Sequence, residues 1–88
     1  MKVVILYRPQ SEQARPVEEF LHEFQRLYPG KSIELRDIDT PAGTALVDLF
    51  DLTSQPAVLA LKDDEQLVQS WVGLPLPLMN EVAYYVTS

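Results

Sequence analysis

Ser11 stands between two arginines, Arg8 and Arg15, just ahead of an apolar pattern with helical spacing. A hydroxyl at the first turn of a helix, flanked by two guanidinium groups, can bind an anion. The same residues also suit a structural arrangement in which Ser11 only caps the helix. The two arginines would then pair with Glu12 and Glu19. We favour the structural arrangement and keep the anion site as the alternative.

Few other side chains could carry catalysis or bind a metal. His22 is the only histidine, and Glu18 four residues before it completes no more than a two-ligand site, which is weak for a metal. We therefore expect no metal and a solvated His22. Carboxylates come in three groups, and a hydrolase built on one of them would need a cleft and a raised pKa that the pattern does not indicate. The groups are Asp37 with Asp39, Asp48 with Asp51, and residues 63–65.

Composition excludes several classes of protein. The chain has 88 residues, no cysteine and a net charge of −6. Without cysteine it can form no disulfide, thiolate nucleophile or cysteine-based zinc site. The negative charge argues against nucleic acid or an anionic membrane as the main partner. The apolar run within residues 1–7 is too short for a signal peptide or a membrane span, so we expect one cytoplasmic domain over residues 1–88.

The first third of the chain predicts a strand followed by a helix. Residues 2–7 form a continuous apolar run, which is typical of a strand buried on both faces of a sheet. Apolar residues at three- and four-residue spacing over residues 17–28 then predict one face of a helix. This helix begins near Ser11 or near Pro16, which is tolerated in a first turn, and stops at Gly30.

The middle of the chain predicts a second strand and a second helix. Residues 32–39 alternate between apolar and polar side chains, which indicates a strand less buried than the first. Thr40 suits the cap of a helix, and Pro41 suits its first position. The expected inner face of this helix is Ala45, Leu46, Leu49 and Phe50.

The last third predicts a β-hairpin and a final helix. Pro56 cannot donate to a ladder, so we place it at the start of a buried strand that ends at residue 61 or 62. A polar turn over residues 62–65 leads to another strand over residues 66–72, which Gly73 ends. Pro75 and Pro77 then introduce a helix whose expected core face is Leu78, Met79, Val82, Tyr85 and Val86.

The resulting order is strand, helix, strand, helix, strand, strand, helix. The initial βαβ unit requires two parallel strands with a right-handed crossover, and the hairpin makes the sheet mixed. We therefore predict an α/β fold in which three helices flank a four-stranded mixed sheet on both faces.

This pattern resembles the thioredoxin-like superfamily, in its small glutaredoxin-sized form. The resemblance covers nearly the whole chain. Its most specific segments are the aspartate-ended strand at residues 37–39, the helix and loop at residues 45–52, the segment at residues 54–58, and the hairpin end at residues 71–73. It implies a cis Gln55–Pro56 peptide bond whose backbone faces a bound peptide or glutathione. It also implies that Asp39 borders the same groove.

The family's CxxC motif would fall at Ser11, Glu12, Gln13 and Ala14, and none of these residues is a cysteine. A serine hydroxyl cannot cycle through a disulfide, so dithiol oxidoreductase activity is excluded. The resemblance thus implies a cysteine-less, non-redox member of the superfamily.

We predict a non-enzymatic binding module without a cofactor, which recognises a protein or peptide along residues 11–14, Gln55, Pro56 and Gly73. An extended peptide would use backbone hydrogen bonds from Gln55. The first alternative is an enzyme or carrier that binds glutathione or another anion at Arg8, Ser11 and Arg15. A glutathione transferase would need a Glu-Ser pair after the hairpin and a second helical domain, and Gly73, Leu74 and Pro75 stand in place of that pair.

The second alternative is a structural module that self-associates through Trp71. This residue falls late in the last predicted strand, which is expected to be an edge of the sheet. Its more ordinary role is to pack under the last helix, and we favour that role. An exposed Trp71 would instead mark a contact surface.

Overall fold

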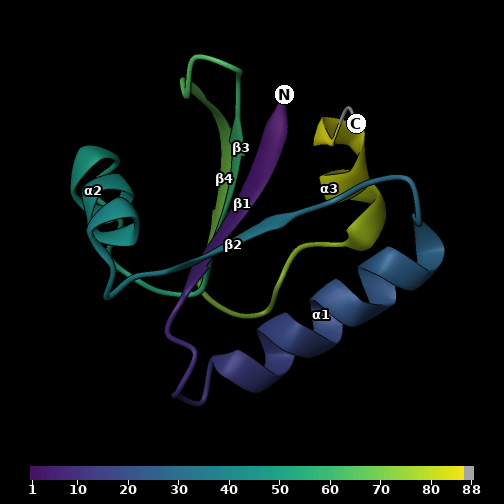
Figure 1. Cartoon of the computed structure of the whole chain (residues 1–88), viewed down its shortest axis with the longest axis horizontal. Coiled ribbons are helices and arrows are strands. Elements are labelled where there is room, and N and C mark those ends of the chain that lie inside the picture. Colours follow the sequence, from purple (N-terminus) through teal and green to yellow (C-terminus); the bar gives the residue numbers. More distant parts are fainter. Residues whose placement is uncertain (87–88) are drawn as a thin grey trace.

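The computed structural model describes residues 1–86 and arranges them as four strands and three helices around one sheet (Figure 1). The elements follow the predicted order, with a βαβ unit first and a hairpin before the last helix. Their bounds are β1 (Lys2–Tyr7), α1 (Ala14–Leu27), β2 (Glu34–Asp37), α2 (Pro41–Leu49), β3 (Ala57–Leu61), β4 (Leu67–Val72) and α3 (Met79–Tyr85).

The sheet has the strand order β2-β1-β3-β4, so β2 and β4 are its edges. β1 and β2 run parallel, with Tyr7 opposite Asp37 at their ends. β3 pairs antiparallel with β1 and with β4, and it forms the predicted hairpin with β4. The predicted α/β class with a four-stranded mixed sheet and three helices is therefore confirmed.

Each face of the sheet has its own hydrophobic core, because successive side chains of a strand point to opposite faces. α1 and α3 cover one face, and α2 covers the other (Figure 1). Ile5 and Val58 pack with Phe24 of α1 and with Val82 of α3 on the first face. The second core is smaller and consists of Val4, Leu6, Leu46, Ala57, Leu59 and Leu61.

α1 begins at Ala14, three residues after the position at which Ser11 would cap it. Gln13 precedes the helix with helical φ and ψ angles, and its side chain makes no capping hydrogen bond. Pro16 is the third residue of α1, where a missing N–H removes no intrahelical bond. Ser11 therefore caps the turn before the helix rather than the helix itself.

α2 begins as predicted, because the Thr40 side chain accepts a hydrogen bond from the Gly43 N–H and Pro41 occupies the first turn. Its inner face, however, is rotated from the predicted one. Gly43 and Leu46 are buried, whereas Ala45 and Leu49 are exposed. Positions 43, 46, 47 and 50 face the sheet, because Gly43 allows the helix backbone to approach the end of β2 closely.

α3 differs from its predicted face only at Leu78 and Ala83, because Met79, Val82, Tyr85 and Val86 do pack in the first core. Leu78 is the residue before the helix and is 65% exposed, so it is not part of the core. Ala83, which the pattern did not single out, is buried together with Val82 and Val86. The helix starts at Met79, and the i, i+3, i+4 and i+7 spacing from that residue gives the inner face.

Candidate functional site at one end of the sheet

Four loops meet at one end of the sheet. β1 and β2 end there, β3 begins there, and β4 ends there, since Leu6 lies opposite Ala57 and Ala57 lies opposite Val72. The predicted site residues on the loop after β1, before β3 and after β4 are therefore at the same end of the molecule. Figure 1 shows these loops below the sheet in its orientation.

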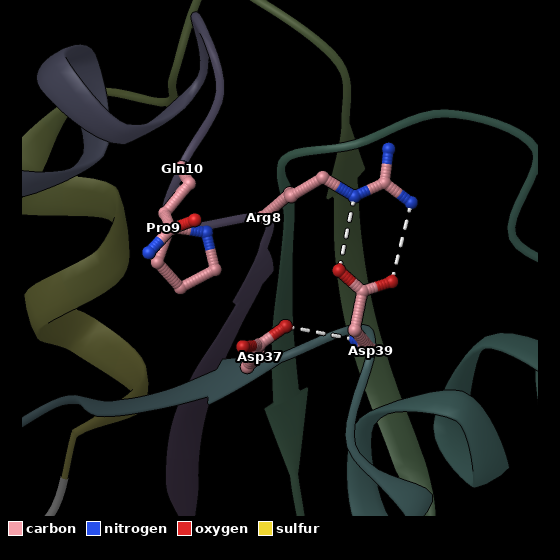
Figure 2. Close-up of a pocket in the computed structure, with 5 residues that line it drawn as sticks. All are labelled: Arg8, Pro9, Gln10, Asp37 and Asp39. Carbon is pink, nitrogen blue, oxygen red and sulfur yellow. Dashed lines mark hydrogen bonds and ion pairs between the residues drawn. The ribbon is translucent and has the colours of Figure 1, made fainter.

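A pocket of about 380 Å³ lies between the loop after β1 and the loop after β2 (Figure 2). Arg8 reaches across from the first loop and bonds Asp39 through two atoms. Its Nε lies 3.2 Å from Oδ2, and its Nη2 lies 3.3 Å from Oδ1. Asp37 Oδ1 accepts a bond from the Asp39 backbone N–H at 2.8 Å. Pro9 and Gln10 complete the lining.

The loop from Arg8 to Gln13 is held by its own hydrogen bonds. The Ser11 hydroxyl donates to the Arg8 carbonyl at 2.7 Å and accepts from the Gln13 N–H at 3.2 Å. The Gln13 side chain in turn accepts from the Arg8 N–H at 3.2 Å. Ser11 thus stabilises the turn ahead of α1 and does not cap the helix, so the favoured interpretation of Ser11 as a helix cap is wrong.

Arg8 and Arg15 each pair with a carboxylate, and the two carboxylates lie on different segments of the chain. Arg15 pairs with Glu19 as predicted, at 3.0 Å. The expected pair of Arg8 with Glu12 is wrong, because Arg8 instead bonds Asp39 on the neighbouring loop. The amides at the start of α1 are also largely occupied or missing, since the Ala14 N–H bonds the Ser11 carbonyl and residue 16 is a proline.

The segment before β3 differs from the loop after β1 in its hydrogen bonding. The Gln55–Pro56 peptide bond is cis, as the resemblance implied, and the Pro56 carbonyl accepts from the Gly73 N–H at 2.9 Å. Thr53, Ser54 and Gln55 make no hydrogen bond, from backbone or side chain, with any part of residues 1–86. Three consecutive peptide units are therefore open at this end of the sheet.

Tyr7 is the buried last residue of β1 and directly precedes Arg8 of the pocket. Burial raises the pKa of its hydroxyl, and the carboxylates of Glu18 and Asp37 raise it further. The phenol keeps its proton at neutral pH and can only donate or accept a hydrogen bond.

Asp39 was expected to border the groove at Gln55 and Pro56. It lines the pocket between the loops after β1 and β2, whose lining in residues 1–86 does not include Gln55 or Pro56. Pro9, Gln10 and Asp37 also line this pocket and were not predicted from the sequence. The parallel pairing of β1 and β2 was the available signal, because it brings the ends of the two strands, and the loops after them, to the same edge. Glu12 and Ala14 contribute no side-chain hydrogen bond to the pocket, and the predicted site as a whole stays a prediction.

Residues 1–86 contain no group of three histidine or carboxylate side chains that could hold a metal ion. Within the same part of the chain, every helix is too short or too polar to cross a bilayer.

Comparisons with known proteins identify the fold. A scan against protein-family models finds no match, and a search of curated proteins finds none. Among solved structures, the chain is similar to thioredoxin O2 from Arabidopsis thaliana in its oxidized state, with a TM-score of 0.65 and 14% identity over 94% of this chain and 69% of that one. It is also similar to a structure described as a malarial protein, with a TM-score of 0.62 and 18% identity over 94% of this chain and 89% of that one. The chain therefore has a thioredoxin-like fold, and it has this fold without a single cysteine.

Proposed function

We propose that this protein is a non-redox binding module that takes an extended polypeptide segment at the end of the sheet described above. The observation that carries the proposal is the open backbone of residues 53–55. These units lie next to the Pro56 carbonyl, which is already paired with Gly73. An incoming strand can satisfy open N–H and C=O groups without displacing an internal bond.

The charge around this end favours a basic segment. Arg8 and Asp39 neutralise each other, which leaves Asp37 as the uncompensated charge of the pocket. The chain as a whole carries a net charge of −6. A lysine or arginine of the partner could therefore lie against Asp37 while the backbone of the partner pairs with residues 53–55.

A peptide titration tests this proposal. The probes are two capped hexapeptides, one alternating valine with lysine and one alternating valine with glutamate. We expect the amide signals of Ser54, Gln55 and Gly73 to shift in NMR spectra with the lysine peptide. We expect its affinity to exceed that of the glutamate peptide by about tenfold, or 1.4 kcal/mol.

Asp37→Asn should reduce that preference, because the amide keeps the acceptor for the Asp39 N–H but loses the charge. Asp48→Asn is the matched control, since Asp48 is exposed on α2 and does not line the pocket. The proposal is wrong if the signals of residues 53–55 stay still at millimolar peptide. Shifts confined to residues 11–14 on addition of glutathione would instead favour the anion-binding alternative.

A further inference from the structure

β4 is an unprotected edge of the sheet. It pairs only with β3 within the described residues, and its six residues include no charge and no proline. Val68 and Val72 are 41% and 45% exposed. The one irregularity of the β3–β4 ladder lies at the start of β4, so residues 69–72 remain regular. Edge strands usually carry charges, prolines or bulges that prevent pairing with another chain, and this stretch has none of them.

The opposite edge of the same sheet is protected. Three of the four residues of β2 are charged, namely Glu34, Arg36 and Asp37. Arg36 forms an ion pair with Glu34 on the same strand and lies 3.8 Å from Glu65 of the hairpin turn. The two edges of the sheet therefore differ, because charged side chains protect β2 and no charged side chain protects β4.

The hydrogen bonds identify which backbone groups of β4 face outward. Residues of an antiparallel strand alternate between facing their partner strand and facing away from it. The Gly73 N–H bonds Pro56 next to β3, so Val72 and Ser70 face away. The Ser70 N–H accordingly bonds only the side chain of the neighbouring Gln69, whose Oε1 lies 2.9 Å away. A flexible side chain thus occupies the place that another strand would take.

We propose that a second copy of this chain pairs with β4 in antiparallel orientation, centred on Ser70. Ser70 would lie opposite Ser70 of the second copy, and Gln69 would lie opposite Trp71 of the second copy, within the regular part of β4. Such a two-fold arrangement is self-complementary and joins the two four-stranded sheets into one.

The distribution of charge favours this occupant and this orientation. Antiparallel pairing places the acidic turns of the two copies, residues 63–65, at opposite ends of the paired strands. Parallel pairing would bring the two acidic turns together, which costs free energy by repulsion. A basic peptide would find no carboxylate anywhere in β4, whereas an uncharged edge pairs readily with another uncharged edge.

An aromatic row runs from β4 onto the last helix. Trp71 packs edge-on against Tyr85 with ring centres 5.6 Å apart, which confirms that the last helix covers it. Tyr85 contacts Tyr84 at 5.0 Å, and Tyr84 is 78% exposed. Tryptophan and tyrosine are enriched in protein interfaces, so this row suits the border of the strand pairing.

Sedimentation equilibrium of the whole chain tests the pairing. We expect a species of twice the 10.0 kDa chain mass at high concentration. Added salt should strengthen the association, because each copy carries a net charge of −6 and salt screens their repulsion. Val72→Lys should raise the dimer Kd by about tenfold or more, since charge on an edge strand opposes pairing.

Leu49→Lys is the matched control, because it makes the same change in charge at an apolar residue of α2 that is 67% exposed. Val68→Lys gives a second edge variant, and circular dichroism checks that each variant folds. The amides of Ser70 and Val72 should exchange with deuterium more slowly in the dimer than in the monomer. A single species of monomer mass at every concentration and salt level overturns the proposal. A dimer that Leu49→Lys weakens as much as Val72→Lys does also overturns it.

Discussion

The carbonyl oxygen of Asp37 lies where a side chain on Gly43 would begin. A Cβ added to Gly43 would stand 2.1 Å from that oxygen, well inside contact distance. The close approach packs the first turn of α2 onto the end of β2. Because Asp37 also lines the pocket, this contact holds one wall of the proposed binding site in place.

Gly43→Ala should therefore destabilise the protein by about 1–3 kcal/mol, the usual range for overpacking, because the clash is with backbone that cannot rotate away. Urea unfolding measures the change. Gly30→Ala is the control, since nothing lies within 4 Å of its added Cβ, and it should be near neutral. Equal losses in the two variants would show that the approach to Asp37 is not the cause.

Thr40→Ala should cost about 1 kcal/mol, as expected for the loss of a helix cap. The Thr40 hydroxyl accepts from the Gly43 N–H at 3.2 Å and donates to the Asp37 carbonyl at 2.7 Å. Thermal unfolding measures the loss. Thr53→Ala removes the same atoms from a residue without a hydrogen bond in the described chain, so it should leave the melting temperature nearly unchanged. An unchanged melting temperature in Thr40→Ala would mean that the cap does not stabilise α2.

The pair of Arg8 with Asp39 should matter more for the shape of the pocket than for stability. Both side chains are more than half exposed, so their coupling in a double-mutant cycle should be about 0.2–1 kcal/mol. Arg8→Lys should still shift the amide signals of both pocket loops in NMR spectra, because an ammonium cannot make the two-pronged contact. Arg15→Lys, at the pair with Glu19, is the control and should leave the Asp39 signal in place. An unchanged Asp39 signal in Arg8→Lys would contradict this role.

Low pH should reduce the folding stability of the protein, in part because Glu65 becomes protonated. The hydrogen bond from Lys2 lowers the pKa of this carboxyl, and the charges of Lys2 and Arg36 lower it further. Since the folded-state pKa is below the ordinary 4.5, the stabilisation is complete above that value and is lost as the pH falls through the lowered pKa. NMR titration of the Glu65 carboxyl in the wild-type protein and in Lys2→Met measures the effect. The variant should titrate closer to the ordinary value, and an identical curve would remove Lys2 as the cause.

The amino-acid pattern was enough to predict the order of the elements and to exclude dithiol chemistry. Continuous apolar runs predicted β1 and β3 because central strands bury both faces, and Thr40 with Pro41 predicted the start of α2 from local chemistry alone. The lack of cysteine needed no structure at all. The order of the elements follows from residues close together in the chain, and the absence of dithiol chemistry follows from composition alone.

Long-range packing selects the face that each short helix buries and the side chains that meet at the pocket. Periodicity alone allowed two neighbouring faces of α2, and the contact of Gly43 with Asp37 selected one of them. Arg8 had a nearby glutamate as a plausible partner, yet it bonds Asp39, 31 positions away, because β1 and β2 pair in parallel and end together. Which backbone groups of β4 face outward likewise depends on its pairing with β3, because alternate residues of an antiparallel strand face away from their partner strand.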